Sequence, residues 1–429
     1  MLSPVKYTLV FLLLISYGFL GYIIKPGDVL NTAILIGVVF AIYFYLTGFT
    51  QDKREISALL WFSMVFRMLF LFSIPMLSTD YVRFLFDGKL ILNGFNPYLY
   101  SPKQVLAENT SVASSLFGNF FNSIETNSKY SLAFPFIQYL KAIPAYFLEI
   151  NPTISLVLLR LPILVAEFVI FKFLIKLLEK LNLSYSGILI YALNPLVIIG
   201  LVANISFINI AFCLFVVGLY YLIQNKLIQS MLLIGFSSAC SIFTILLLPL
   251  VFKKIGTAKS VFYVVVIVLT LSLFSFSFYQ EGIFELLLAN LKSNIAVTKI
   301  NFGLANVFDW FTGKSHIIIP TLFLVALFSI SISRANDWIS VIKGMMFCVT
   351  TVILLSFNIK PHYFIILLIF STIIQQYHYA ILWSLIAFIN YPVFTHQLEA
   401  QNWIMPVEFS LLLVLFLLEL FGKTKKLTE

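Results

Sequence analysis

Residues 29–49 read VLNTAILIGVVFAIYFYLTGF and contain no charged side chain. A helix of about 20 consecutive apolar residues is long enough to cross the hydrocarbon core of a bilayer. Predominantly apolar runs flank this stretch at residues 6–24 and 56–78. The pattern predicts an all-α fold, a polytopic bundle of transmembrane helices.

The composition of the whole chain supports this class. Of the 429 residues, 61% are hydrophobic and 10% are charged, whereas soluble domains are about half apolar and a quarter charged. The length allows about 12–14 spans, and the number depends on whether residues 135–150 and 228–252 cross the bilayer. No soluble domain or linker interrupts the pattern, so residues 1–429 are interpreted as a single integral membrane domain.

Basic residues beside the apolar runs predict the orientation. Lys6, the charged cluster at residues 51–55 and the lysines at 423–426 stand next to such runs, and positions of this kind stay cytoplasmic. Both termini are therefore expected in the cytoplasm of a multi-pass protein of the cell (inner) membrane. The long polar stretch 79–133 then reaches the exoplasmic, periplasmic face as a loop of interfacial helices. A second exoplasmic loop is expected at 280–315.

The densest polar motif of the first outer loop is DYVRFLFDG, residues 80–88. Arg83 stands three residues after Asp80 and four before Asp87, so the three side chains share one face of a helix. An acid at the boundary between water and lipid is partly desolvated, which raises its pKa toward that of a useful base. From physical chemistry alone two interpretations stand: a catalytic or anion-binding site, or a salt-bridged helix end.

Together with the Gly-x-Asn-Pro-Tyr element at 94–98, this motif resembles the first exoplasmic loop of the C-type (GT-C) membrane glycosyltransferases, in their bacterial mannosyltransferase-like branch. Three further elements are similar to that family: YSLAFPFIQ at 130–138, Asn194-Pro195-Leu196 with Asn204, and Lys360-Pro361-His362-Tyr363. The resemblance extends over about residues 56–375 and is most specific at 80–98.

The resemblance implies a hexosyltransferase that moves a hexose, expected to be mannose, from a polyprenyl-phosphate carrier to a glycan or lipid acceptor at the periplasmic face. Asp80 would be the catalytic general base, and the implied substrate-binding residues are Arg83, Asp87, Asn96, Tyr98, Gln138, Lys360, His362 and Tyr363. A lone carboxylate acting as base predicts an inverting reaction, because no second carboxylate serves as nucleophile. Protein cations can neutralise a departing phosphate, so no cofactor or metal is required, although a divalent metal is compatible with the pattern.

The expected partners are the lipid-linked sugar donor, the glycan or lipid acceptor and the membrane lipids. The formal net charge of +9 comes from basic residues in short loops and at the chain ends, where they set topology. No nucleic-acid partner is therefore expected, and the oligomeric state is left open.

The sequence departs from the family pattern after Asn194-Pro195-Leu196, where the family tends to carry a Glu and then a His with an acidic residue. Gly200, Ser206 and Ile208 occupy those places. Two alternatives therefore stand beside the enzyme: a family member that has lost or changed its activity, and a transporter or flippase of lipid-linked sugars. A transporter favours paired half-sequences and a site near the bilayer midplane. The absence of such symmetry in the sequence, and an acidic motif at a membrane edge, favour the enzyme.

Three ionisable residues lie inside expected spans, where charges are costly and need partners. Arg67 is expected to pair with Glu167 or to cap a polar cavity. Arg160 is expected either to tie helices together or to approach the lipid phosphate.

Overall fold

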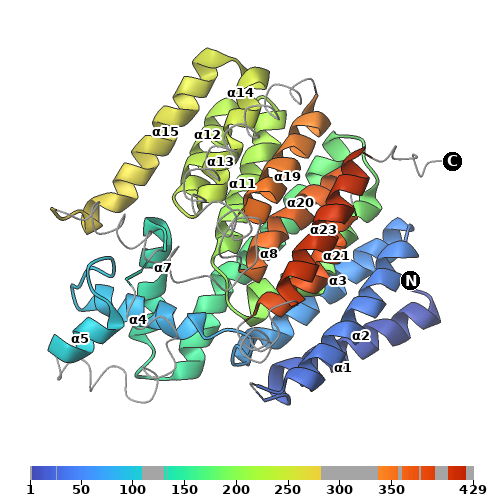
Figure 1. The fold of residues 1–429 in the computed structure, drawn as a ribbon, viewed down its shortest axis with the longest axis horizontal. Helices are drawn as coiled ribbons and strands as arrows, with labels where there is room; N and C mark the ends of the chain where they lie inside the picture. The colour runs from blue at the N-terminus through green and yellow to red at the C-terminus, as the bar shows by residue number, and fades with distance from the viewer. Residues whose placement is uncertain are drawn as a thin grey trace.

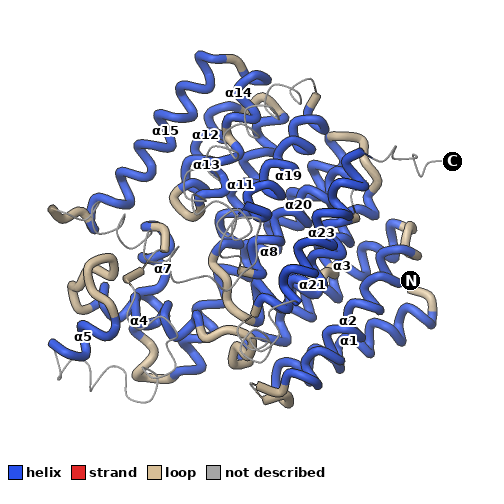
Figure 2. Tube along the Cα trace, viewed as in Figure 1, coloured by secondary structure: helices blue, strands red, loops and turns tan. Residues whose placement is uncertain are grey.

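The structure is a computed structural model that describes residues 2–25, 27–108, 130–131, 133–281, 337–355, 360–375, 378–391 and 404–421. Within these ranges all regular structure is helical, and no strand is present (Figure 2). The all-α prediction is confirmed. The expected loop at 280–315 lies outside the described residues except for residues 280–281, as does part of the loop at 79–133.

Six described helical segments are long and apolar enough to cross a membrane. They are α1 (Pro4–Tyr22), α2 (Val29–Gly48), α3 (Lys53–Leu69) with η1 (Phe70–Phe72), α8 (Pro152–Lys180), α15 (Thr257–Ser275) with η5 (Phe276–Phe278), and α19 (Trp338–Leu355). A further pair of segments, Tyr185–Ala192 and Pro195–Ala203, passes the same test when taken together and is bent by 49°. The protein is thus a multi-pass membrane protein, while the total of about 12–14 spans stays a prediction.

The other described helices are shorter. At one end of the bundle lie α4 (Asp80–Leu92), α5 (Pro102–Glu108) and α7 (Pro135–Tyr146), as Figure 1 shows. The bent pair consists of η3 (Tyr185–Gly187), α9 (Ile188–Ala192), α10 (Pro195–Val197) and η4 (Ile198–Ala203), of which η4 is a π-helical turn. The remaining helices are α11 (Ile208–Ile223), α12 (Leu227–Ser238), α13 (Ile242–Leu247), α14 (Pro249–Ile255), η6 (Pro361–Phe364), α20 (Ile365–Ile374), α21 (Tyr379–Ile386), η7 (Ala387–Asn390) and α23 (Ile404–Phe421).

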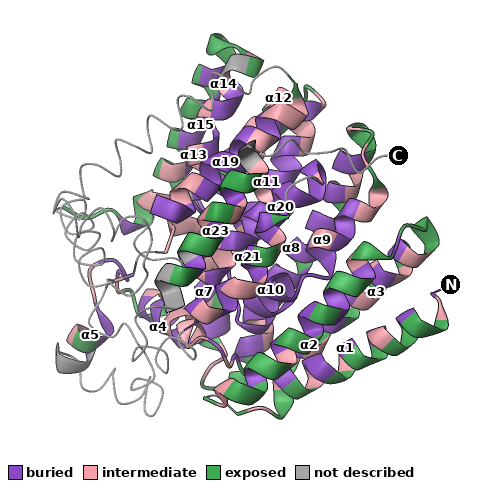
Figure 3. Cartoon of the chain, turned by 45° about the vertical axis from the view of Figure 1, so that its right-hand side comes forward, coloured by how far each residue is buried: buried purple, intermediate pink, exposed green. Residues whose placement is uncertain are grey.

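The distribution of polarity is that of a membrane protein. Large apolar side chains are exposed along the outer faces of α1, α2 and α15, for example Phe11, Leu30 and Leu269 (Figure 3). Charged side chains within the bundle, such as Arg67 and Glu167, are completely buried. Extended exposed apolar faces of this kind mark contact with an apolar phase rather than with water.

Several contacts define a first end of the bundle, here called the Lys6 end. Lys6 Nζ lies 2.5 Å from the carboxylate of Glu55. Gln51 borders one surface hollow together with Glu179 near the end of α8. Gln375 Nε2, just after α20, donates to the Ser184 carbonyl over 2.7 Å. The N-terminus, the loop between α2 and α3, and the end of α8 therefore lie together.

The opposite end, here called the Asp80 end, carries α4, α5 and α7. At 12 residues, α7 is about 18 Å long, and it packs along α4 without running to the Lys6 end. Ser155 at the start of α8 donates to the Pro144 carbonyl of α7 over 2.8 Å. Since α8 then runs to the Lys6 end, its basic residues from Lys172 to Lys180 approach the side that also carries Lys6. This arrangement agrees with the positive-inside rule.

Residues 228–252 leave the Lys6 end and return to it. At the start of α12, Lys226 Nζ lies 5.8 Å from the ring centroid of Tyr221. Near the far end of α12, the ring of Phe236 contacts Phe136 of α7. The chain turns back through α13 and α14, and Lys254 Nζ then lies 5.7 Å from the ring centroid of Trp338, where α19 begins.

A buried ion pair joins α3 to α8 at the centre of the bundle. Arg67 Nε lies 2.7 Å from Glu167 Oε2, and both side chains are fully buried. Arg67 Nη1 also donates to the Ala192 carbonyl at the break between α9 and α10, over 2.9 Å. Tyr191 donates to the second Glu167 oxygen over 2.6 Å. The expected pairing of Arg67 with Glu167 is confirmed.

Arg160 ties three segments at the Asp80 end. Its guanidinium donates to the carbonyls of Val202 and Ala203 at the end of η4, over 3.0 and 2.9 Å, and to the Leu71 carbonyl of η1 over 3.1 Å. Partially negative carbonyls at helix ends are suitable partners for a buried cation. Of the two roles expected for Arg160, this geometry supports the tying of helices.

The two ends can be distinguished by cysteine labelling, because the three native cysteines are buried. Gln51→Cys at the Lys6 end and Lys103→Cys in α5 place thiols at exposed positions. A membrane-impermeant thiol reagent applied to intact cells is expected to modify one of them and to reach the other only after permeabilisation. The unsubstituted protein is the control. Equal reaction of both positions in intact cells would contradict the arrangement.

Candidate active site

The chain reaches the site through an extended segment between η1 and α4. The amide of Leu77 donates to Asn204 Oδ1 over 3.0 Å, which fastens the segment to the end of η4. Asn204 Nδ2 in turn donates to the Ile199 carbonyl over 3.0 Å. Asp80 is the first residue of α4, where an acidic side chain interacts favourably with the helix dipole, and its amide donates to Ser78 Oγ over 3.2 Å.

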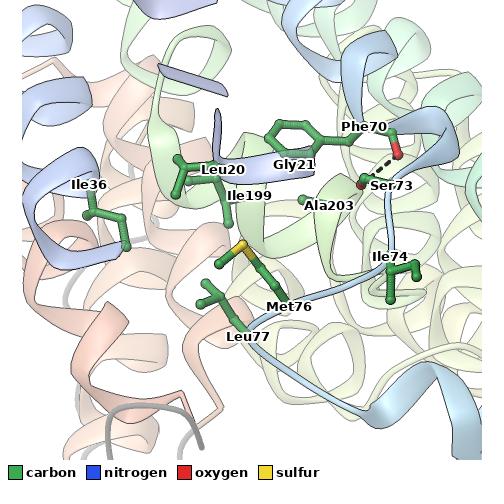
Figure 4. A pocket seen from close by; sticks show the side chains of 10 residues that line it. All are labelled: Leu20, Gly21, Ile36, Phe70, Ser73, Ile74, Met76, Leu77, Ile199 and Ala203. Atoms are coloured by element: carbon green, nitrogen blue, oxygen red, sulfur yellow. Dashed lines mark hydrogen bonds between the residues drawn. The ribbon is translucent and has the colours of Figure 1, made fainter. Parts of the chain in front are cut away.

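A small apolar pocket lies beside this segment (Figure 4). Leu20 and Ile36 contribute from α1 and α2, Met76 and Leu77 from the segment itself, and Ile199 from η4. Its cavity volume is about 10 Å³, which is room for about one water molecule. The lining suits hydrocarbon and offers little to a charged group.

Asp80 forms an ion pair with a residue 280 positions away. Lys360 Nζ donates to Asp80 Oδ2 over 2.7 Å. The Asp80 side chain is 34% exposed and that of Lys360 is 44% exposed, so both can be reached from outside the bundle. Lys360 directly precedes η6, in which Pro361 and Phe364 are buried. Two sequence-predicted site residues from distant parts of the chain are thus in contact.

The electrostatic surroundings keep Asp80 ionised. Burial acts to raise the pKa of the Asp80 carboxyl, but the Lys360 ammonium and its hydrogen bond outweigh burial, and the pKa lies below its ordinary value. Burial, followed by the charge of Lys360, lowers the pKa of His362 to about 3. At neutral pH the site therefore holds an aspartate, a lysine cation and an uncharged imidazole.

Two turns further along α4, Asp87 is 1% exposed and is the centre of a closed polar network. Arg83 Nε donates to Asp87 Oδ1 over 2.8 Å. Lys141 Nζ and Ser131 Oγ both donate to Asp87 Oδ2, over 2.9 and 2.7 Å. Gln138 completes the network, because its Nε2 donates to Ser131 Oγ over 2.7 Å and its Oε1 accepts from Lys141 over 3.1 Å.

This network determines the charge state of its members. Burial acts to raise the pKa of Asp87, but Arg83 and Lys141 outweigh it, and the pKa lies below its ordinary value. Asp87 is therefore an ionised carboxylate held by two cations. The proposed substrate-binding roles of Arg83, Asp87 and Gln138 stay predictions. In the structure these residues join α4 to α7, in a network centred two turns after Asp80.

Gly88, the last residue of the motif, permits the contact between α4 and α7. A Cβ atom at this position would lie 2.2 Å from the Lys141 carbonyl oxygen and 2.6 Å from the Ala145 side chain. Distances this short exclude any side chain without movement of a helix. The glycine therefore sets the distance at which Lys141 meets Asp87.

Asn96 and Tyr98 organise the loop after α4. Asn96 Oδ1 accepts from the amide of Tyr98 over 3.0 Å, and its Nδ2 donates to the Phe278 carbonyl over 2.7 Å. The Tyr98 hydroxyl donates to the Ala133 carbonyl over 2.6 Å. Both side chains are buried. Their expected contact with substrate stays a prediction, and the structure shows them joining α4 to η5 and to the segment before α7.

His362 and Tyr363 lie on η6 beside the ion pair. The two rings stand edge to face with centroids 4.7 Å apart, and Tyr363 also contacts Phe243 of α13. At the position where the family tends to carry Glu, a Cβ atom on Gly200 would lie 2.9 Å from the hydroxyl of Tyr391. A glycine at position 200 thus has a steric reason, because Tyr391 fills the space that a larger side chain would need.

Sequence reasoning did not select Lys141, Ser131 or Tyr391 as site residues. A signal for Lys141 is present: it is a lysine in an apolar run, three residues after Gln138 and so on the same helix face. Nothing in the sequence indicates Tyr391, because its place depends on the packing of η7 against η6. Within the described ranges, no group of three or more His, Cys, Asp or Glu side chains could hold a metal ion.

The fold and the site define a helical membrane protein with an accessible, ionised acid at the start of α4 and a cation held against that acid. Comparison with protein families gives its enzyme class. Residues 20–255, more than half of the chain, match the family described as Alpha-(1->6)-mannopyranosyltransferase, N-terminal domain. The chain belongs to this MptA/B family.

The family membership makes the chain a mannosyltransferase, and it decides between the enzyme and the transporter considered from the sequence. The matched segment contains the motif at 80–88 and Gln138, and it ends before Lys360. No curated protein and no solved structure matches the chain.

Gly88→Ala is expected to lower the stability of the protein by about 1–3 kcal/mol, because the added methyl group forces α7 away from α4. Thermal unfolding in detergent measures the effect. Gly18→Ala is the matched control, since a Cβ on this helical glycine of α1 has no atom within 4 Å. Unchanged unfolding of Gly88→Ala would show that the two helices are not held at this distance.

Proposed function

We propose that the protein transfers mannose from a polyprenyl-phosphate carrier to a hydroxyl group of a glycan or lipid acceptor, with inversion, at the periplasmic face. The observation that carries the proposal is the accessible Asp80 carboxylate paired with Lys360 at the start of α4. Asp80 is the general base: it accepts the proton of the acceptor hydroxyl as that oxygen attacks the anomeric carbon. The bond between that carbon and the phosphate oxygen breaks, and the lipid phosphate leaves.

The geometry supports a single displacement. Asp87, the next acid on α4, stands seven residues from Asp80, about 10 Å along the helix, and is occupied by Lys141, Arg83 and Ser131. Asp80 is thus a lone reactive carboxylate on this helix, and a base without a partner nucleophile produces inversion. Inversion forms an α-linkage from a β-linked donor.

Lys360 has two roles in this proposal. In the empty site it pairs with Asp80, and when the donor binds, its ammonium turns to the phosphate, whose negative charge grows as the bond to mannose breaks. The turn removes a cation from Asp80, and the carboxylate becomes a stronger base in the presence of substrate. With 44% of its side chain exposed, Lys360 can be reached by a phosphate from outside the bundle.

Two further features support a lipid-linked donor and a periplasmic site. The small pocket lined by Met76 and Leu77 offers an apolar surface (Figure 4), and Leu77 stands three residues before Asp80 in the chain. The Lys6 end carries the basic residues that are expected in the cytoplasm. With Lys6 and Glu55 inside, α4 and its acid face the periplasm.

Asp80→Asn is expected to lower kcat for mannosyl transfer by about 10²–10⁴-fold, because the amide cannot take the proton. The measurement is transfer of labelled mannose from polyprenyl-phosphate mannose in purified protein. Asp28→Asn is the control and should keep full activity, because Asp28 is a partly exposed acid that caps the start of α2 and Asn is an equally good cap.

Equal turnover of Asp80→Asn and the native protein would end the assignment of the base. A nucleotide-activated mannose, tested as an alternative donor, tests the identity of the carrier independently of the assignment of Asp80 as the base. If it serves as well as the lipid-linked sugar, the polyprenyl-phosphate part of the proposal is wrong while the base assignment stands.

Lys360→Met is expected to move the acid limb of the pH profile of kcat/KM upward. Lys360 lowers the pKa of Asp80 and burial raises it, so removal of the lysine leaves burial dominant and the pKa rises above its usual value of about 3.9. In the native enzyme kcat/KM should stay level down to that region, since kcat/KM reports ionisation of the free enzyme. Lys103→Met, in α5, is the control. If the acid limb lay at the same pH in the native protein, Lys360→Met and Lys103→Met, the pairing of Lys360 with Asp80 would be contradicted.

A further inference from the structure

The final turns of α8 carry a row of lysines that the proposed reaction does not use. Lys172, Lys176 and Lys180 are spaced four residues apart, so their side chains follow one face of the helix. Lys172 and Lys180 are exposed, and Lys176 is partly exposed. The row lies at the Lys6 end of the bundle, on the side away from the candidate active site.

Aromatic rings join this row to a fourth lysine. Lys176 Nζ lies 5.0 Å from the ring centroid of Phe173 and 5.7 Å from that of Tyr220 in α11. The ring centroids of Tyr220 and Tyr221 are 5.5 Å apart, and Lys226 Nζ lies 5.8 Å from the Tyr221 centroid. A cation over an aromatic ring is held there electrostatically. The four lysines of this surface are here called the α8 lysine patch: Lys172, Lys176, Lys180 and Lys226.

The protein supplies few anions to this patch. Between residues 168 and 226 the sequence contains four lysines and one acid, Glu179. Glu179 is exposed. The ion pairs formed among the described residues include neither Glu179 nor any lysine of the patch. Four positive charges are therefore collected on a surface with a single negative one.

The outward face of α8 changes character where the lysines begin. Leu161, Val165 and Phe168 are exposed apolar side chains, and their spacing of three or four residues places them on the face that continues through Lys172. Apolar side chains on this face suit the hydrocarbon of a bilayer, whereas lysines extend their ammonium groups toward the polar headgroups. The boundary between acyl chains and headgroups is thus expected between Phe168 and Lys172.

The length of α8 agrees with this boundary. At 29 residues the helix is about 43 Å long, whereas the hydrocarbon core of a bilayer is about 30 Å thick. Part of α8 must therefore extend beyond the hydrocarbon. Tyrosines are frequent at the level of the headgroups, and Tyr220 and Tyr221 stand beside Lys176 and Lys226.

The charge of the patch selects one class of lipid. A lysine ammonium only donates hydrogen bonds, and a lipid phosphate accepts them. In a zwitterionic headgroup a positive amine compensates the phosphate, and this amine is repelled by the patch. An anionic headgroup has no such group, and each lysine near the surface contributes to its binding. The patch is therefore complementary to anionic phospholipids.

We propose that the α8 lysine patch binds the headgroups of anionic phospholipids in the leaflet at the Lys6 end. The lysines contact the phosphates, while Leu161, Val165 and Phe168 contact the acyl chains. Bound lipid holds α8 at a fixed depth in the bilayer, and with it the buried Glu167 that pairs with Arg67. The interaction is independent of the proposed mannosyl transfer.

Thermal unfolding in lipid nanodiscs tests the patch, with phosphatidylglycerol compared with phosphatidylcholine of the same acyl chains. A ligand that binds the folded state stabilises it, so the native protein should unfold at a higher temperature in phosphatidylglycerol. Lys172→Gln/Lys180→Gln should lose most of this difference and should unfold like the native protein in phosphatidylcholine, because both side chains are exposed.

Titration with short-chain phosphatidylglycerol in a neutral detergent measures the affinity itself. The affinity should fall by about 5-fold for each lysine removed. Lys172→Arg/Lys180→Arg keeps both charges and should keep the native affinity.

Lys103→Gln/Lys259→Gln is the matched control. It also removes two exposed lysines, one from α5 and one from α15, so it changes the net charge of the protein equally. Because neither lysine belongs to the patch, this variant should respond to phosphatidylglycerol as the native protein does.

Three results would overturn the proposal. The first is equal unfolding of the native protein in the two lipids. The second is an equal loss of the response in the patch variant and in the control, because net charge alone would then explain it. The third comes from inorganic phosphate added to the protein in phosphatidylcholine: if it stabilises the protein as much as phosphatidylglycerol does, the patch is a site for free anions rather than for lipid.

Discussion

A negative charge buried in an apolar fold has to be matched where it stands, and at the Asp80 end that charge is Asp87. Its two oxygens accept from Arg83, Lys141 and Ser131. An uncompensated charge at such a place would cost several kcal/mol, so the carboxylate determines the positions of its partners. The rest of the site follows from it: α7 lies where Lys141 reaches Asp87, and Asp80 lies two turns earlier, at the start of α4.

The second constraint is that few other charged side chains lie inside the bundle. Arg67 with Glu167, and Arg160 with helix-end carbonyls, use intramembrane charges to join segments at breaks in the helices. Both arginines hold the bent pair that ends in η4. This π-helical turn carries Gly200 to the site, and Asn204 follows directly after it. A π-helical turn within a helix is often found at functional sites. The bend therefore follows from the hydrogen bonds that Arg67 and Arg160 donate to carbonyls of the bent pair.

Sequence reasoning predicted those features that depend on local pattern. The apolar runs predict the helices because a bilayer requires about 20 apolar residues for a span. The spacing of Asp80, Arg83 and Asp87 predicts a shared helix face, and the contact of Arg83 with Asp87 follows from it. The pairing of Arg67 with Glu167 could be predicted because few other charged residues lie inside the expected spans to serve as partners.

Features that depend on long-range packing were not predictable. The contact between Asp80 and Lys360 joins residues 280 positions apart, and only the family resemblance brought both into one site. Whether residues 135–150 cross could not be decided from hydropathy, because a 12-residue apolar helix fits either case. The close packing of α7 on α4 at Gly88 and Lys141 depends on tertiary contacts that no local pattern contains. In the sequence, Tyr391 resembles an ordinary core aromatic residue. Only the structure shows that its hydroxyl lies next to Gly200.

The distance in sequence between Asp80 and Lys360 also has a consequence for biosynthesis. The helices enter the membrane in order, so α4 and the polar network of Asp87 can assemble while the last third of the chain has not yet been made. During that interval Asp80 has no Lys360 beside it, and the nascent protein holds the proposed base without the lysine that the proposal assigns to the phosphate. The complete reactive pair appears only when translation has passed Lys360, and a truncated product in the membrane therefore lacks half of its charge pair.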